Sequence, residues 1–204
     1  MKIGAIVLAA GQSRRFGNGN KLLQPVNGGA MITRVVKTLA ASQAMETIVI
    51  TGYESDLVTQ AVAGIDGVKA IFNEDFNQGM ATSISKGVAG LSDDMDACMI
   101  CLGDMPYLTV DNYNHLIRIF AEENSKDLIL IPTFQERKGH PVIFGRQFFN
   151  QLIALPSNDQ GAKEVIRKNT NSVKEVPMFT DNIHFDIDLK DSFKMSPYDE
   201  RERK

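Results

Sequence analysis

An apolar run near the N-terminus ends abruptly in a glycine-rich, basic loop. Residues 3–10 are apolar or small, and the run breaks at Gly11. A segment that is apolar at consecutive positions is typical of a strand buried on both faces of a parallel sheet. The loop that follows carries Arg14, Arg15 and Lys21 among further glycines. Because glycine lets backbone N–H groups converge on an anion and the cations supply countercharge, we expect the loop to hold phosphate groups.

Two familiar phosphate-binding loops do not fit this segment. A P-loop needs Ser or Thr after its lysine to hold Mg²⁺, whereas Lys21 is followed by Leu22. The dinucleotide pattern G-x-G-x-x-G fails as well, because no glycine stands between Gly11 and Gly17. The segment is therefore an anion-binding loop of another type, with a solvated basic turn as the alternative.

Short apolar segments alternate with amphipathic ones up to about residue 132. Apolar periodicity predicts strands at residues 2–9, 47–52, 68–72, 96–102 and 128–132, and helices at 30–41, 55–63, from about 79, and at 110–123. Ser55 and Asp56 are expected to cap the second helix and Thr109 the last. In the third helix, a buried stripe of Met80, Ile84 and Val88 is expected. Such alternation indicates right-handed crossovers and a mostly parallel sheet.

The pattern changes after residue 133. Shorter strands are predicted at residues 139–145, 173–177 and 182–188, the last two as antiparallel additions, and short helices at 146–155 and 160–168. Pro141 favours an edge position or the start of its strand. We expect a single domain over residues 1–190, followed by a charged tail at 191–204.

Composition excludes several classes of protein. A net charge of −3 over 204 residues argues against general nucleic-acid binding. No apolar run approaches the roughly 20 residues that cross a bilayer, and no signal peptide is evident. Cys98 and Cys101 have C-x-x-C spacing, but on a strand residues three apart point to opposite faces. They are therefore expected to be buried structural thiols, and the cytoplasm is the expected location.

The candidate polar groups all follow predicted strands. Residues 11–21, Gly52, Asn73 and Asp104 come directly after the first four strands. In open α/β sheets ligands bind beyond the carboxyl ends of the strands, so these groups are expected to converge. Asp104, in L-G-D-M-P, is suited to hold Mg²⁺ on a triphosphate, with a turn-capping role as the alternative.

The C-terminal third offers weaker candidates. Asp186 and Asp188 would share one strand face, where either could complete a metal site or simply be solvated. His140, between glycine and proline, is interpreted as a loop residue satisfied by a backbone carbonyl rather than a base. Asp159 is expected to cap a helix, with a substrate contact as a further option.

Taken together, these segments resemble the nucleotidyltransferase family that includes the cytidylyltransferase and the guanylyltransferase of molybdenum cofactor synthesis. The matching stretches are LAAGQSRRFGNGNKLL, NEDFNQGMATS, CLGDMP, GHPVIFG, DQGA and DID. The first stretch, GHP and DQGA resemble the cytidylyltransferase branch more than the guanylyltransferase branch. Departures are the Asn-Gly-Asn before Lys21, Lys163 after DQGA, and Leu189-Lys190 after DID, where Thr-Pro is usual.

The resemblance implies a three-layer Rossmann-like nucleotidyltransferase fold with a mostly parallel sheet and a small antiparallel extension. It implies a nucleotide-binding half at about residues 1–108 and an acceptor-binding half at about 109–190. The implied reaction is Mg²⁺-dependent transfer of CMP from CTP to the phosphate of molybdopterin, with release of pyrophosphate. A molybdenum hydroxylase that receives the cofactor is the implied protein partner; no nucleic acid or membrane partner is expected.

The resemblance also assigns residues to roles. It implies that Arg15, Lys21 and Asp104 are catalytic. It also implies that Asp104 and Asp188 bind the metal ion. The residues that it implies bind the nucleotide are Leu8, Ala9, Ala10, Gly11, Ser13, Arg15, Lys21, Asn73, Gly79 and Ser83. Acceptor binding falls to His140, Asp159, Gln160 and Gly161.

Other functions stay open from the sequence. One is a related nucleotidyltransferase that uses GTP or another NTP and a different phosphorylated acceptor, such as a sugar phosphate. Another is a nicotinamide-dependent oxidoreductase, which the missing G-x-G-x-x-G disfavours. A third is a non-enzymatic nucleotide-binding or cofactor-delivery protein.

Overall fold

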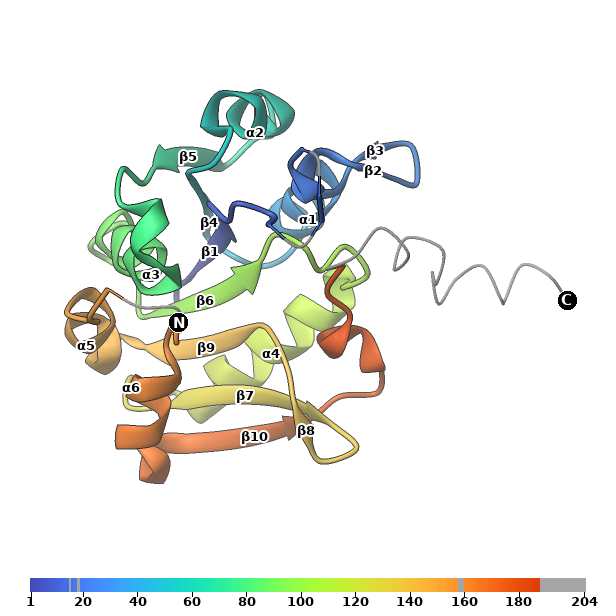
Figure 1. Ribbon diagram of the computed structural model, residues 1–204. Helices are drawn as coiled ribbons and strands as arrows, with labels where there is room; N and C mark the ends of the chain where they lie inside the picture. The colour runs from blue at the N-terminus through green and yellow to red at the C-terminus, as the bar shows by residue number, and fades with distance from the viewer. Residues whose placement is uncertain (15, 18, 158–159, 188–204) are drawn as a thin grey trace, which may run out of the picture.

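A computed structural model describes residues 1–14, 16–17, 19–157 and 160–187 (Figure 1). Three residues that the resemblance assigned to the site, Arg15, Asp159 and Asp188, lie outside this range, as does the tail at 191–204.

An eight-stranded sheet runs through the molecule. Its order is β10-β7-β9-β6-β1-β4-β5, with β8 paired to β7. The strands are β1 (Ile3–Ala9), β4 (Glu46–Thr51), β5 (Val68–Phe72), β6 (Ala97–Leu102), β7 (Ile129–Phe134), β8 (Arg137–Lys138), β9 (Val142–Gly145) and β10 (Val173–Pro177). Of the seven strands on the main path, β9 alone runs opposite to its neighbours. A separate hairpin joins β2 (Pro25–Val26) to β3 (Gly29–Ala30).

Helices cover both faces of the sheet (Figure 1). They are α1 (Met31–Ala40), α2 (Ser55–Val62), α3 (Met80–Ala89), α4 (Val110–Glu123), α5 (Phe149–Ile153) and α6 (Lys163–Lys168). One core packs α1, α2 and α4 on the sheet, and the other packs α3, α5 and α6 on the opposite face. Alternate residues of β1 enter the two cores, Val7 in the first and Ile6 in the second. The expected three-layer, mostly parallel α/β fold is thus confirmed.

Helix α3 approaches the centre of the sheet closely. A Cβ atom built on Gly87 would lie 2.4 Å from Cγ2 of Ile6 in β1. A larger residue there would force the Ile6 side chain or the helix to shift. The contact brings the N-terminus of α3 beside the carboxyl end of β1.

Several element-level expectations are confirmed. Thr109 caps α4, since its side chain accepts from the N–H of Asn112 while the Asn112 side chain accepts from the N–H of Thr109. Cys98 and Cys101 are free, buried and enter different cores, as expected from their strand spacing. Within the described residues, the helices are all too short or too polar to span a bilayer.

Other expectations were wrong. Helix α2 begins at Ser55, so neither Ser55 nor Asp56 is its N-cap. The N-cap is Glu54, which has a left-handed backbone conformation and makes no capping hydrogen bond with its side chain. The Ser55 hydroxyl instead lies 2.8 Å from that of Thr51. Met80 is 43% exposed rather than buried, because it opens α3 at the sheet edge.

The C-terminal third also differs. The expected strand at 182–188 is absent over its described part, where a 3-10 helix, η5 (Asp181–His184), is followed by irregular chain. Strand β10 pairs parallel to β7, not antiparallel. Pro141 precedes an internal strand, β9, whose backbone pairs with both β6 and β7.

Candidate active site

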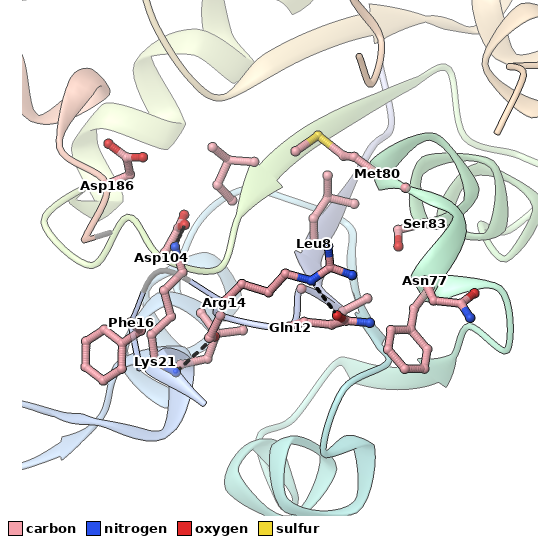
Figure 2. A pocket seen from close by; sticks show the side chains of 17 residues that line it. Leu8, Gln12, Arg14, Phe16, Lys21, Asn77, Met80, Ser83, Asp104 and Asp186 are labelled. Atoms are coloured by element: carbon pink, nitrogen blue, oxygen red, sulfur yellow. Dashed lines mark hydrogen bonds and ion pairs between the residues drawn. The ribbon is translucent and has the colours of Figure 1, made fainter. Parts of the chain in front are cut away.

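A cleft of about 470 Å³ opens at the carboxyl ends of β1 and β6. The chain passes from β1 to β4 and β5 on one side and returns to β6 on the other, so this is where the strand order reverses. Ligands of open α/β sheets bind at such points. The lining residues come from four segments of the chain (Figure 2): Leu8, Ala10, Gly11, Gln12, Ser13, Arg14, Phe16, Lys21 and Leu22; Phe76, Asn77, Gly79, Met80 and Ser83; Leu102 and Asp104; and Asp186.

The loop after β1 is folded around Lys21. The Ser13 hydroxyl accepts a hydrogen bond from the backbone N–H of Lys21 at 3.1 Å. Asn20 is 2% exposed, donates to the carbonyl of Tyr53 and accepts from the N–H of Leu22. These bonds start a 3-10 helix, η1 (Lys21–Leu23), and direct the lysine into the cleft. The Asn-Gly-Asn departure therefore leaves Lys21 in the wall.

Lys21 and Asp104 form an ion pair across the cleft. The Nζ–Oδ2 distance is 2.6 Å, and the side chains are 15% and 17% exposed. The other carboxylate oxygen of Asp104, Oδ1, is buried and has no hydrogen-bond partner among the described residues. A buried carboxylate oxygen without a donor is costly unless a ligand satisfies it.

Asp186 adds a second carboxylate to the same cleft (Figure 2). The N–H of the next residue, Ile187, donates to the carbonyl of Asp104 at 3.0 Å and ties the two segments together. The η5 turn before it is anchored by Asn182, whose amide donates to the carbonyl of Tyr107 at 2.8 Å.

The donor set suits a hard divalent cation completed by substrate oxygens. Mg²⁺ and Mn²⁺ prefer oxygen ligands, and Mg²⁺ commonly takes one or two carboxylates together with phosphates. Asp104, with one oxygen lacking a donor, and Asp186 fit this description. Across the described ranges, three or more His, Cys, Asp or Glu side chains never converge as a ready-made metal site.

Asn73 lies behind the cleft wall and does not line it. Its side chain is 2% exposed. Its Nδ2 donates to the hydroxyls of Thr82 and Ser83, and its Oδ1 accepts from the N–H of Asp75. Asn73 thus fixes the start of α3, from which Ser83 reaches the cleft. Ala9, also assigned to nucleotide binding, is 1% exposed and packs in the core.

The residues assigned to an acceptor are set back from the lining. The backbone N–H of His140 donates to the carbonyl of Ile183, and its Nδ1 is buried without a partner among the described atoms. Burial lowers the pKa of His140, although the negative charge of Asp104 opposes this. Gly161, in left-handed conformation, packs on Met80: a Cβ there would lie 2.9 Å from the sulfur.

Some lining residues were not singled out from the sequence. They are Gln12, Phe16, Leu22, Phe76, Asn77, Met80 and Leu102. Arg14 was visible as a member of the basic loop. Phe76 and Asn77 carry no signal of their own, because the 3-10 turn η2 (Phe76–Gln78) that presents them has no periodic pattern.

Sequence comparison now identifies the family. Residues 5–173 match the family described as the MobA-like NTP transferase domain. The chain belongs to this family. The match covers every segment of the cleft except Asp186. As a member of the MobA-like family, the protein is a nucleotidyltransferase with a Rossmann-like fold.

Three curated relatives differ in what their names describe. The molybdenum cofactor cytidylyltransferase of Escherichia coli K12 is 27% identical over 191 residues, which are 94% of this chain and 93% of that protein. The nicotine blue oxidoreductase of Paenarthrobacter nicotinovorans is 24% identical and covers 90% of both chains. The bifunctional protein GlmU of Brevibacillus brevis is 31% identical over 172 residues, which span 37% of GlmU.

Solved structures support the MobA-like fold. Rv0371c from Mycobacterium tuberculosis aligns with a TM-score of 0.81 at 22% identity, over 96% of this chain and 97% of that one. A manganese complex of the same protein aligns with a TM-score of 0.79. CMP:2-keto-3-deoxy-manno-octonic acid synthetase bound to CTP aligns at 0.74 and 14% identity, over 100% of both chains. At these identities the likeness concerns the fold.

Proposed function

We propose that this nucleotidyltransferase moves CMP from CTP to the phosphate of a molybdopterin-type acceptor and releases pyrophosphate. The observation that carries the proposal is the meeting of the basic loop with two carboxylates in one cleft, Lys21 against Asp104 and Asp186. The choice of CTP and molybdopterin rests on similarity to the E. coli cytidylyltransferase along nearly the whole of both chains.

We assign the following roles to the residues in and around the cleft. Gly11, Ser13 and Lys21 bind the triphosphate, and Leu8, Ala10, Gly79 and Ser83 bound the rest of the nucleotide. Asn73 and Ala9 support these walls from behind. His140, Gln160 and Gly161 serve the acceptor side, and Gly161 does so from behind Met80. Arg15, Asp159 and Asp188 keep their proposed roles in phosphate, acceptor and metal binding on the resemblance alone.

The chemistry is an in-line displacement at the α-phosphorus. An oxygen of the acceptor phosphate forms a bond to that phosphorus, and the bond from it to the bridging oxygen of pyrophosphate breaks. Because the attacking phosphate is already an anion, no strong general base is needed, and His140 is not assigned as one. Lys21 holds and neutralises the triphosphate, so catalysis consists of positioning and charge stabilisation.

Asp104 and Asp186 would hold a divalent cation, which supplies charge neutralisation to the triphosphate when bound. The family commonly uses such an ion, and we propose Mg²⁺. Both cysteines are free thiols, which fits our proposal of a cytoplasmic location.

The decisive experiment measures pyrophosphate release with each of the four NTPs, with and without molybdopterin-type cofactor and with Mg²⁺ throughout. We expect release with CTP that requires the cofactor. Release with another NTP or with a sugar phosphate in place of the cofactor would replace the proposed substrates. Absence of release in every combination would overturn the proposal.

A variant at Lys21 tests the catalytic role that we propose for this residue. We expect Lys21→Ala to lower kcat by roughly a hundredfold to a thousandfold, the usual cost of losing one preorganised charge-stabilising donor. The control is Lys37→Ala, an exposed lysine on α1. An unchanged kcat in the Lys21 variant would remove this residue from catalysis.

A second function is raised by the relative named nicotine blue oxidoreductase. The same protein samples should therefore be assayed for consumption of NADH and NADPH with nicotine blue as the second substrate. Turnover there, without pyrophosphate release from any NTP, would favour an oxidoreductase. A delivery role toward a molybdenum hydroxylase would appear instead as cofactor binding without turnover.

A further inference from the structure

The outer face of helix α4 carries a second depression, separate from the cleft. It has a volume of about 360 Å³. Asp111, Asn114, His115 and Arg118 of α4 line it, and Phe179 lines it from the loop after β10. The depression and the cleft share no lining residue. We call these five residues the α4 face.

Phe179 is the most exposed large apolar side chain of the described residues, at 92%. Its ring centroid lies 5.9 Å from that of His115. The backbone on both sides of it is fixed, because the N–H of Met178 donates to the carbonyl of Thr133 at 2.7 Å and the Thr180 side chain caps the η5 turn. An aromatic ring held in water by a fixed backbone is suited to be the central contact of an interface, since it loses little freedom on binding.

Opposite charges stand at the two ends of the α4 face. Asp111 lies in the first turn of α4 and Arg118 follows seven residues later; both are exposed. Seven residues are about two helical turns, so both side chains point the same way, about 10 Å apart along the helix axis. Arg118 contacts Nδ1 of His115 at 3.2 Å and lies 4.0 Å from Glu122, and these exposed contacts leave it open to a further partner.

We propose that the α4 face binds a second copy of this chain, with the two α4 helices antiparallel across a two-fold axis. Positions 111 and 118 are equally far from an axis that passes between Asn114 and His115. Asp111 of each copy therefore faces Arg118 of the other, and Phe179, beside His115, is covered at the centre. A two-fold contact needs a self-complementary patch, which this face provides. The inference does not depend on the substrates of the cleft.

The α4 face consists of one helix and one loop, so the interface is small. We expect a dimer with a dissociation constant of about 1–100 µM, as for contacts at the low end of interface size. Sedimentation equilibrium of the full chain, from micromolar to submillimolar concentration, measures this constant. The charge-reversal control is Lys69→Glu, an exposed lysine on the edge strand β5, and it should dimerise as the parent does.

Phe179→Ala should weaken the dimer about tenfold to a hundredfold, as for the loss of a central aromatic contact. Because Phe179 is exposed in the single copy, the unfolding temperature of dilute protein should not change. This variant leaves α4 untouched, so the test survives if a substitution in the helix impairs folding.

The charge-reversal variants Asp111→Arg and Arg118→Asp should each weaken the dimer at least about tenfold, since like charges then meet at both ends of the interface. Asp111→Arg also removes a favourable charge from the first turn of α4, so the unfolding temperatures of the dilute variants are compared with the parent.

An equimolar mixture of the two reversal variants gives the sharpest test. Each variant repels itself, but a two-fold contact between one copy of each again pairs opposite charges at both ends. We expect the mixture to dimerise within about threefold of the parent's dissociation constant. The parent has a net charge of −3, so neither reversal makes the protein positive. Recovery in the mixture is therefore not a general attraction between proteins of opposite charge.

The outcomes divide as follows. A dimer that is weakened by Phe179→Ala and by each reversal, and restored in the mixture, supports the inference. A parent chain that stays monomeric at submillimolar concentration overturns it and leaves the α4 face to a different partner. A dimer that Phe179→Ala and both reversals leave unchanged has its interface elsewhere, which also overturns it. Folded reversal variants whose mixture does not recover overturn the antiparallel arrangement.

Discussion

Lys21 and Asp104 neutralise each other at the centre of the cleft, and each is also a candidate ligand for substrate. The 2.6 Å pair occupies the Oδ2 atom of Asp104 and leaves Oδ1 buried without a donor. A cation that binds Asp104 in the absence of nucleotide must therefore approach a carboxylate that already has a positive neighbour. Under the proposed function, a bound nucleotide would remove this conflict by drawing the lysine to its phosphates.

This pairing predicts weak metal binding by the nucleotide-free protein. Lys21→Met should raise its affinity for Mn²⁺ about fivefold to tenfold, since removing a like charge a few ångströms away relieves roughly a kilocalorie per mole of repulsion. Electron paramagnetic resonance of free Mn²⁺ measures this without any turnover. Asp104→Asn is the companion variant and should lower the affinity. Equal Mn²⁺ affinity in the parent and the Lys21 variant would contradict the prediction.

The two cysteines give a second prediction at this scale. Burial raises the pKa of both thiols, so the reactive thiolate is scarce in the folded protein. Native protein at pH 8 should react with a thiol reagent at least a hundredfold more slowly than protein in guanidinium, where two thiols per chain should titrate. Rapid labelling of one thiol in the native state would show that its strand opens.

Single residues were predictable where strand order alone decided their place. Lys21 and Asp104 meet because both follow strands that end at the same edge of a parallel sheet. Asn73 also follows such a strand, but its amide turns inward to hold Ser83 and Thr82. No pattern in one sequence distinguishes an amide that supports a wall from one that faces a ligand.

At the scale of the element, α4 is the helix whose start the sequence specifies best. Thr109 and Asn112 form a reciprocal capping box that satisfies two N–H groups at its N-terminus. Thr109→Ala should lower the free energy of unfolding by about 1 kcal/mol, a typical cost for a lost N-cap. Thr109→Ser keeps the hydroxyl and serves as the control. Urea unfolding measures both, and equal midpoints for the alanine and serine variants would contradict the prediction.

Elements without a capping motif of this kind were less predictable from the sequence. Residues 182–187 have the apolar alternation of a strand, with Ile183, Phe185 and Ile187 on one side. They form η5 and irregular chain instead, because Asn182 is anchored to Tyr107 and Ile187 to Asp104, contacts distant in sequence. Helix α2 likewise starts without the expected cap, since Ser55 bonds to Thr51.

On the scale of the whole molecule, acidic side chains are held ionised by lysines. Hydrogen bonds from Lys2, Lys86 and Lys168 lower the pKa values of Asp94, Glu74 and Glu164, respectively. The pKa of Asp96 is lowered chiefly by Lys126 and further by the backbone N–H of Lys2. A carboxyl whose folded-state pKa lies below its ordinary value stabilises the fold above that ordinary value. The contribution is lost as the pH falls through the lowered value.

The free energy of unfolding should therefore fall as the pH drops from the ordinary values of 4.5 for Glu and 3.8 for Asp toward the lowered ones. Denaturant titrations at steps of half a pH unit between about pH 6 and pH 3 measure the slope of the free energy of unfolding against pH. Asp96→Asn should flatten it. High salt should flatten it in the parent, because these pairs lie at the surface. Identical slopes for the parent and the Asp96 variant would refute the assignment.

The architecture as a whole followed from periodicity, since near-continuous apolar strands separated by amphipathic helices leave few topologies besides a doubly wound sheet. The reversed strand β9 was beyond that reasoning. Val142 to Gly145 are buried on both faces, like most residues of the parallel strands β1, β4 and β6, so the amino-acid composition of β9 does not indicate its direction.

The bond from Ile187 to Asp104 has a consequence for how the protein is made. Three of the four segments that line the cleft are complete by residue 104, and the fourth arrives with Asp186, 82 residues later. A ribosome-bound chain that ends before residue 186 lacks the second carboxylate, even when β1, β4, β5 and β6 have all been synthesised. The cleft therefore gains its full set of charges only when the last part of the described chain has been synthesised, so an unfinished polypeptide holds an incomplete site.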